Sequence, residues 1–213
     1  SSTNQAPRQF DLGRPGKEFW VWLRLKLIAD VGLIGLPNAG KSTFLSTVTR
    51  AHPKIGDYPF TTLHPNLGVV RRDDNEFLLA DVPGLIEGAS TGTGLGTRFL
   101  GHVERCRVLV HLIDATIEDP AYGYRVIRNE IRTYGNGLAD KPELLVLTKC
   151  DAITKKEAKC LTDELAAASG QNVMQLSAVT GRGVEDLVWE IFKAVKNTDT
   201  LQAPESPWKV HSS

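Results

Sequence analysis

Nearly continuous apolar runs alternate with helical patterns along most of this chain. Five of these runs predict strands, because strands buried on both faces of a sheet show little polar alternation. They lie around residues 31–35, 76–81, 108–114, 144–148 and 172–176. Residues 66–72 are expected to add an antiparallel edge strand. The pattern predicts a three-layer α/β/α fold with a doubly wound, mostly parallel six-stranded sheet.

Helix signals fall between the expected strands. Asp119-Pro120 reads as a cap followed by proline at the first helical position, and Thr154 with Glu157 reads as a capping box. Later in the chain, apolar residues at helical spacing predict one buried helix face, formed by Val184, Leu187, Val188, Ile191 and Val195.

The first expected strand runs directly into a glycine-rich loop that matches GxxxxGK[ST]. Backbone N–H groups of such a loop converge on phosphates, and the ammonium of Lys41 neutralises their charge. Ser42 is placed to offer its hydroxyl to Mg²⁺. The residues expected to bind nucleotide phosphate here are Gly35, Leu36, Pro37, Asn38, Ala39, Gly40, Lys41, Ser42 and Thr43.

A second motif, Asp81-Val82-Pro83-Gly84, follows the strand at 76–81. The Asp81 carboxylate can hold Mg²⁺ through water, and the Gly84 amide can sense a γ-phosphate. Taken alone, four residues are a weak signal. Their position at a strand end is what makes them relevant.

Two further strand ends predict which base is bound. Thr148-Lys149-Cys150-Asp151 is a variant of NKxD, in which the Asp151 carboxylate accepts two hydrogen bonds from guanine and the Lys149 stem lies over the base. Adenine presents an acceptor where guanine presents donors, so Asp151 disfavours an ATP-dependent enzyme. Ser177-Ala178-Val179 follows the last strand, where backbone amides are expected to meet the guanine carbonyl.

Composition bounds the remaining possibilities. The 213 residues suffice for one well-cored domain with an appendage, and 25 basic against 25 acidic residues give no bulk attraction to nucleic acid, so direct DNA binding is not expected. Three cysteines without CxxC spacing indicate reduced, buried thiols rather than a disulfide framework or a zinc site. No apolar run is long enough to span a membrane, and we expect a soluble, cytoplasmic monomer.

The first residues depart from the alternating pattern. Phe19 to Leu27 alternates as a strand does, with Trp20 and Trp22 on its outer face. One interpretation is an ordinary edge strand with exposed aromatic residues. The other is the last strand of an N-terminal domain whose remainder is not part of this sequence. We expect residues 1–27 to be that remnant with its linker strand, residues 28–197 to be the nucleotide-binding domain, and residues 198–213 to be a polar tail.

Taken together, the motifs closely resemble the Obg (CgtA) GTPases, which have a Ras-like P-loop NTPase domain. The resemblance covers essentially the whole chain and rests on Leu25 to Thr43, Tyr58 to Leu63, Pro65 to Val69, Asp81 to Ala89 and Arg98 to Cys106. It implies slow hydrolysis of GTP to GDP and phosphate by a molecular switch. It also implies a role in assembling the large ribosomal subunit, bound mainly through the N-terminal domain, and binding of guanosine tetraphosphate.

The resemblance also implies roles for residues that spacing alone does not assign. Lys41, Thr62 and Gly84 would be catalytic, with Mg²⁺ bound directly by Ser42 and Thr62. The first switch would contribute nucleotide contacts from Phe60, Thr61, Thr62, Leu63 and His64.

Two residues depart from the wider GTPase pattern and change what we expect of nucleotide binding and of the hydrolysis rate. Thr148 replaces the NKxD asparagine, which weakens one hydrogen bond to the phosphate loop at a cost of about 1 kcal/mol. Leu85 stands where many GTPases carry a water-orienting glutamine, as it does in Obg proteins, so intrinsic hydrolysis should be slow. Asn38 could compensate by helping to bind K⁺ beside the phosphates, and a simple loop hydrogen bond is its alternative role.

Two functions therefore stay open. The first is a GTP-hydrolysing switch. The second is a guanine-nucleotide sensor, responding also to guanosine tetraphosphate, in which hydrolysis is incidental.

Overall fold

The structure is a computed structural model that describes residues 13, 16, 18, 29–49, 54–55, 66–73, 75–81 and 100–201, with only the backbone described at 54–55 and 199–201. The strand expected at Phe19 to Leu27 and the choice between its two interpretations lie outside these residues. No helix in these ranges is both long and apolar enough to cross a membrane.

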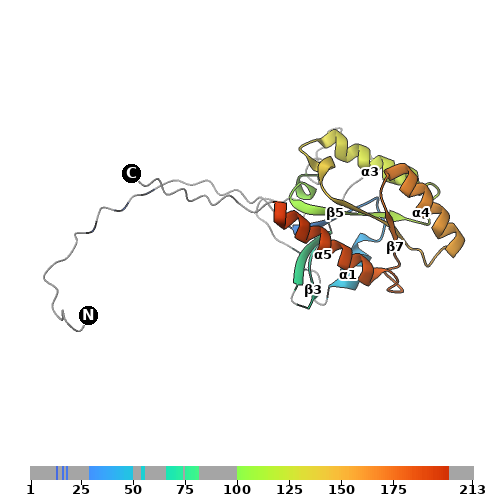
Figure 1. Cartoon of the computed structure of the whole chain (residues 1–213), viewed down its shortest axis with the longest axis horizontal. Helices are drawn as coiled ribbons and strands as arrows, with labels where there is room; N and C mark the ends of the chain where they lie inside the picture. The colour runs from blue at the N-terminus through green and yellow to red at the C-terminus, as the bar shows by residue number, and fades with distance from the viewer. Residues whose placement is uncertain are drawn as a thin grey trace.

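One sheet forms the centre of the domain (Figure 1). Its strand order is β2-β3-β4-β1-β5-β6-β7. Pairing is parallel from β4 through β1, β5 and β6 to β7, and antiparallel between β2, β3 and β4. The strands are β1 (Ala29–Ile34), β2 (Lys54–Ile55), β3 (Asn66–Arg72), β4 (Asn75–Asp81), β5 (Cys106–Asp114), β6 (Glu143–Thr148) and β7 (Val173–Gln175). The six predicted strands are confirmed, and so is the antiparallel pairing of residues 66–72. The expectation that this strand lies at the edge was wrong, because the two-residue β2 adds a seventh strand outside it.

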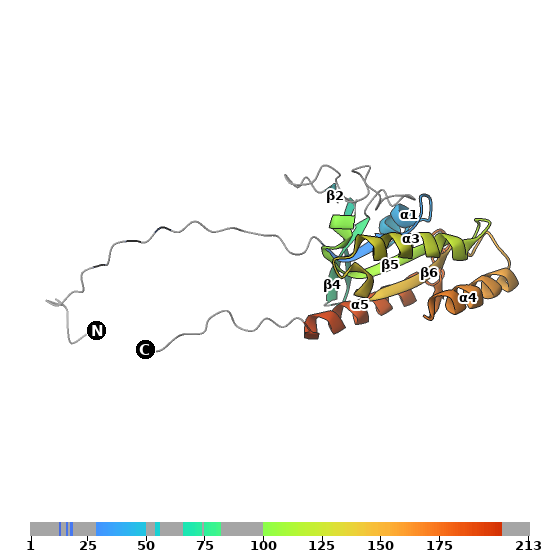
Figure 2. The same cartoon turned by 90° about the horizontal axis from the view of Figure 1, so that it is seen from above.

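Helices cover both faces of this sheet. They are α1 (Lys41–Val48), α3 (Pro120–Tyr134), α4 (Lys155–Ser169) and α5 (Val184–Leu201), with a short 3₁₀ helix η1 (Leu138–Asp140). α1 and α5 pack on one face, and α3 and α4 lie on the other (Figures 1 and 2). The three-layer α/β/α prediction is therefore confirmed. α5 continues to Leu201, past the expected domain end at residue 197.

The predicted helix face on α5 is confirmed by its packing. Val184, Leu187, Val188, Ile191 and Val195 all join one buried cluster with β1, β4, β5 and α1. Burying each such side chain stabilises the fold by about 1.5–3 kcal/mol. α5 is thus held to the sheet by hydrophobic burial along its length.

Both predicted caps are present. The Asp119 side chain accepts a hydrogen bond from the Tyr122 amide at the start of α3, with Pro120 in the first turn. Thr154 and Glu157 form the reciprocal capping box of α4. Each cap satisfies backbone donors that the helix cannot pair internally.

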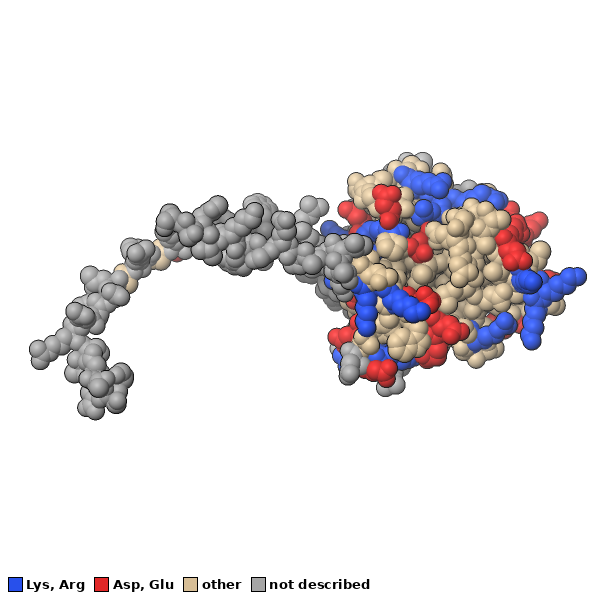
Figure 3. All heavy atoms as spheres, in the orientation of Figure 1, with Lys and Arg blue, Asp and Glu red and all other residues tan. Residues whose placement is uncertain are grey.

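The cysteine expectation was wrong at one position. Cys106 and Cys150 are buried free thiols, but Cys160 is exposed on α4. Charged side chains of both signs are interspersed over the face shown in Figure 3, in keeping with the balanced composition.

Candidate functional site

The sequence motifs meet at the carboxyl ends of the parallel strands, because the strands that precede the motifs are neighbours in the sheet. Register pairs Leu33 of β1 with Asp81 of β4, and Asp114 of β5 with Thr148 of β6. The carboxyl ends of parallel strands are where open α/β sheets bind ligands. These strand ends thus bring together the phosphate loop, Asp81, the Thr148 motif and the Ser177 motif.

The phosphate loop is shaped by two glycines. A Cβ on Gly35 would lie 2.3 Å from the Leu112 carbonyl oxygen, and its φ of +144° also favours glycine. Gly40 has a φ of +92° and immediately precedes α1. The loop therefore leads directly into the amino end of α1, where the backbone N–H groups of a helix attract anions.

Lys41 folds its side chain back over this loop. Its Nζ donates hydrogen bonds to the carbonyl oxygens of Gly35 and Leu36, both at 3.0 Å. Burial lowers the pKa of Lys41, and the nearby Asp81 carboxylate opposes part of that shift. The ammonium is thus held at the loop from which it could reach bound phosphates.

Ser42 and Asp81 form the group expected to hold Mg²⁺. Ser42 Oγ donates to Asp81 Oδ2 at 2.5 Å, and Asp81 is only 2% exposed. Asp81 Oδ1 is buried without a hydrogen-bond partner among the described residues. A carboxylate oxygen left unpaired beside a hydroxyl oxygen fits a hard cation such as Mg²⁺, directly or through water.

The Thr148 motif is anchored against the phosphate loop and β5. The Thr148 hydroxyl lies 2.9 Å from the Ala39 carbonyl oxygen and 3.0 Å from that of Ile113. It therefore contacts the phosphate loop, as expected for a partial replacement of asparagine. Cys150 is buried, which raises its thiol pKa, whereas Asp151 is exposed and accessible to a ligand.

The Ser177 motif is fixed by backbone contacts. The Ser177 amide donates to the Arg182 carbonyl at 2.9 Å, and Ser177 Oγ accepts from the Thr180 amide. The Ala178 carbonyl accepts from Thr47 Oγ1 at 3.3 Å, which links this loop to α1. Val179 is 81% exposed.

Sequence reasoning missed one residue at these strand ends, Asp114. Its Oδ2 accepts a hydrogen bond from Lys149 Nζ at 2.6 Å, and its Oδ1 accepts from Thr116 Oγ1 at 2.7 Å. Burial alone would raise the pKa of Asp114, but the hydrogen bonds from Lys149 and Thr116 outweigh it and hold the pKa below its usual range. The signal available in the sequence was a carboxylate at the end of the apolar run 108–114.

The remaining expected site residues lie outside the described residues. They are Phe60, Thr61, Thr62, Leu63, His64, Val82, Pro83 and Gly84. Of the phosphate-loop residues, Pro37, Asn38, Ser42 and Thr43 are exposed, and Asn38 adopts a left-handed backbone with φ 63°.

The fold and the order of these motifs define a P-loop nucleotide-binding domain of the GTPase class. The chain belongs to the family of 50S ribosome-binding GTPases, whose sequence profile matches residues 30–149. It is similar to GTPase Obg of Zymomonas mobilis subsp. mobilis, with 62% identity over 192 residues, which are 90% of this chain and 55% of that protein. The resemblance to Obg is confirmed, and the chain spans about half the length of this curated relative.

Solved structures agree with the fold. An Era mutant of Aquifex aeolicus bound to GDP·AlF4⁻ superposes with a TM-score of 0.62 at 26% identity, over 78% of this chain and 56% of that one. An S. thermophilus NFeoB mutant bound to GDP gives a TM-score of 0.63 at 23% identity, over 80% and 64% of the two chains. The second likeness concerns the fold alone.

Proposed function

We propose that this chain is the guanine-nucleotide domain of an Obg-type GTPase that slowly hydrolyses GTP to GDP and phosphate. The observation that carries the proposal is the convergence, at neighbouring strand ends, of Lys41, the Ser42–Asp81 pair and the Thr148 motif. A site of this kind accelerates phosphoryl transfer by positioning and charge stabilisation rather than by covalent chemistry.

The phosphate end is assigned to the loop and to Lys41. Loop amides and the amino end of α1 would bind the phosphate oxygens, with Lys41 neutralising charge that develops on them. Ser42 would hold Mg²⁺ directly and Asp81 would hold it through water, joined by Thr62. When bound, this cation supplies neutralisation of the phosphate charge. Gly84 would sense the γ-phosphate through its amide.

The guanine end is assigned to Asp151, Lys149 and the Ser177–Val179 amides. Asp151 is exposed at the end of β6 and can accept from both donors of guanine. Lys149 would lie over the base, and the Asp114 carboxylate at 2.6 Å keeps its side chain in that region. Asp114 is therefore proposed as a positioning residue for base binding.

A direct test compares nucleotide binding by the wild type and by Lys41→Ala. The control is Lys193→Ala, because Lys193 is an exposed lysine of α5 paired with Glu190. Displacement of fluorescent GDP should be achieved by GTP and not by ATP, and Lys41→Ala should weaken GTP binding at least tenfold while Lys193→Ala leaves it unchanged. Displacement by ATP as well as by GTP would contradict guanine selection.

The biological output proposed is a cytoplasmic switch acting in large ribosomal subunit assembly. Support comes from the family to which the chain belongs and from its likeness to Obg. Loss of the γ-phosphate would release the segments around 58–64 and 84–97 and change affinity for the partner. Co-sedimentation of the full-length protein with ribosomal subunits, in each nucleotide state, tests this role.

A guanine-nucleotide sensor is the second candidate, and Leu85 favours it. An aliphatic side chain cannot orient the attacking water, so hydrolysis without a partner would be slow. Single-turnover hydrolysis with and without ribosomal particles separates the two. Acceleration by particles supports the switch. An unchanged slow rate, together with tight binding of guanosine tetraphosphate, supports the sensor.

A further inference from the structure

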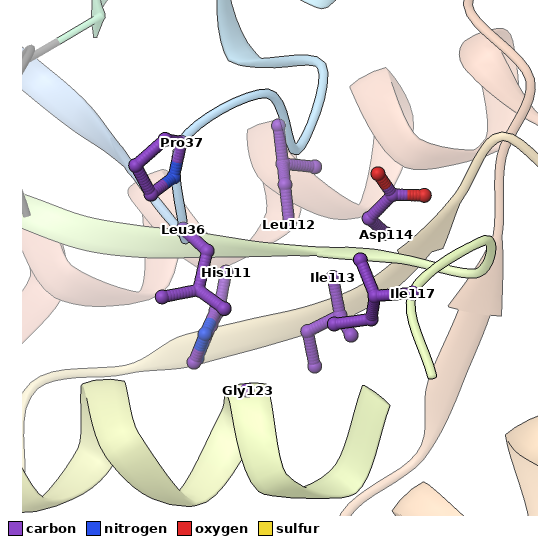
Figure 4. Close-up of a pocket in the computed structure, with 8 residues that line it drawn as sticks. All are labelled: Leu36, Pro37, His111, Leu112, Ile113, Asp114, Ile117 and Gly123. Atoms are coloured by element: carbon purple, nitrogen blue, oxygen red, sulfur yellow. The ribbon is translucent and has the colours of Figure 1, made fainter. Parts of the chain in front are cut away.

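The proposed base site lies between two segments, and each is held by its own contacts. On one side, Asp114 ends β5 beside a pocket between the phosphate loop and α3. Its carboxylate points away from α3 (Figure 4) and holds Lys149. On the other side lies the loop of residues 177–183, whose first amides are proposed to meet the guanine carbonyl. This loop is held by contacts that centre on Gln175.

Gln175 is the last residue of β7 and touches the returning end of the loop in two ways. Its side-chain Oε1 accepts a hydrogen bond from Arg182 Nη2 at 3.3 Å. Its backbone carbonyl oxygen lies where a Cβ on Gly183 would be, so only glycine fits there, and the φ of +76° at Gly183 also favours glycine. The end of the loop therefore packs directly on Gln175.

The other half of the Gln175 amide is bound to α4. Its Nε2 donates to Thr162 Oγ1 at 3.0 Å, and the Thr162 hydroxyl donates in turn to the Ala158 carbonyl at 2.7 Å. An arginine side chain only donates and a hydroxyl has a single hydrogen, so these partners fix which end of the amide faces the loop. Gln175 is thus a bridge from α4 to Arg182.

Arg182 passes this restraint to the residues proposed to face guanine. Its carbonyl oxygen accepts a hydrogen bond from the Ser177 amide at 2.9 Å. The Gly181 amide donates to the Ser177 carbonyl at 2.9 Å, and the Thr180 amide donates to Ser177 Oγ at 3.2 Å. Because the loop is closed on itself in this way, the position of Arg182 determines where the amide of Ala178 lies.

We propose that Gln175 is a positioning residue for guanine recognition, which holds the Ala178 amide where the guanine O6 carbonyl binds. This inference rests on the proposed guanine site. Gln175 itself does not touch the nucleotide, since it acts through Arg182 and the closed loop. Without the bridge the loop shifts, which weakens the hydrogen bond to O6 and leaves the contacts of Asp151 and of the phosphate loop in place.

The test compares GDP with 6-thio-GDP in calorimetric titrations of the whole chain. Sulfur replaces O6 in 6-thio-GDP and is the weaker acceptor, while the guanine donors that face Asp151 are unchanged. One hydrogen bond is worth up to about tenfold in affinity, so the wild type should bind GDP about fivefold more tightly. Gln175→Leu should weaken GDP binding about three- to fivefold and keep 6-thio-GDP within about twofold, which removes most of the preference.

Three further variants separate positioning from a general effect on the fold. Arg182→Ala breaks the same bridge at an exposed residue and should reduce the preference to the same extent. Gln175→Glu keeps an acceptor for Arg182 and should retain the wild-type preference. Gln171→Leu is the matched control, because Gln171 is an exposed glutamine just before β7, at the end of that strand away from the loop. It should bind both nucleotides as the wild type does.

The outcomes distinguish this inference from the proposed function. Equal binding of GDP and 6-thio-GDP by the wild type would show that no amide reads O6, which contradicts the proposed base contact and the inference with it. A wild-type preference that Gln175→Leu or Arg182→Ala leaves intact would overturn the role of Gln175 alone. A parallel loss of affinity for both nucleotides would also overturn it, because the effect would then be a general one on the fold.

Discussion

The Thr148 hydroxyl joins the proposed base-binding motif to the phosphate loop, and its removal should affect both stability and nucleotide affinity. Thr148 is only 4% exposed, with Oγ1 at 2.9 Å from the Ala39 carbonyl and 3.0 Å from the Ile113 carbonyl. One hydroxyl hydrogen can be donated to only one of these oxygens at a time. The net contribution is therefore that of a single hydrogen bond, about 1 kcal/mol.

Thr148→Val removes the donor and keeps the shape of the side chain. Losing the bond and leaving a buried carbonyl without it should lower the free energy of unfolding by about 1–2 kcal/mol. If half of this loss, about 0.5–1 kcal/mol, is a loss of nucleotide-binding free energy, GDP affinity falls about two- to fivefold. Urea unfolding of the nucleotide-free chain measures the first effect, and calorimetric titration with GDP measures the second.

Two further variants at this position distinguish the hydrogen bond from packing. Thr148→Ser keeps the donor and should stay within about twofold of wild-type GDP affinity. Thr148→Asn supplies two N–H donors, one for each carbonyl, and should tighten GDP binding about fivefold. Wild-type affinity in Thr148→Val, or weaker binding in Thr148→Asn, would refute the view that Thr148 is a partial replacement for asparagine.

Four other substitutions test separate parts of the site and its supports. Asp151→Asn should shift preference from GTP to XTP, because the amide donates where the carboxylate accepted, and an unchanged GTP preference in competition assays would refute the assignment. Asp114→Asn should weaken GDP binding about five- to tenfold, because it releases the Lys149 side chain. The unfolding free energy should change little if the role of Asp114 is to position Lys149. K⁺ should accelerate GTP hydrolysis over Na⁺ at equal ionic strength, and Asn38→Ala should abolish that difference while GDP affinity stays nearly intact; equal rates in both salts would exclude a K⁺ role. Burial alone would raise the pKa of Glu143, but His111 and Arg128 outweigh it and hold that pKa below its usual range. The ionised carboxylate therefore stabilises the fold above the usual carboxyl pKa, and this stabilisation is lost as the pH falls through the lowered folded-state pKa. Between about pH 6 and about pH 3.5, the melting temperature should fall less in Glu143→Gln than in the wild type.

Much of the fold could be predicted because buried strands and helix faces require apolar residues in patterns that are visible in the sequence. A strand buried on both faces is apolar over most of its length, so β1, β5 and β6 stood out as runs rich in Val, Leu and Ile. Caps need particular side chains at particular positions, which is why Asp119 and Thr154 identified helix starts. β2 has only two residues and is defined by its pairing with β3, so no local pattern could indicate it.

The site was predictable to the extent that its chemistry lies in contiguous motifs. Lys41, Ser42 and Asp81 could be proposed as site residues because phosphate and metal binding demand fixed spacing. The contacts of Asp114 and His111 could not be predicted, because each joins residues more than thirty positions apart within otherwise apolar strands. Such pairs depend on the register of β5 with β6, which the sequence alone does not specify.

β5 carries no motif, but it supports the proposed nucleotide site through its neighbours on both sides, β1 and β6. Three consecutive residues of β5 each support a different part of the site. The Leu112 carbonyl lies so close to Gly35 that only glycine fits there, the Ile113 carbonyl lies within hydrogen-bond distance of the Thr148 hydroxyl, and the Asp114 carboxylate holds Lys149. Because two of these contacts are made by backbone atoms, side-chain identity at 112 and 113 is set by the core and leaves no trace of the functional role. A displacement of the end of β5 would therefore disturb phosphate and base binding together, although none of its atoms is proposed to touch the nucleotide.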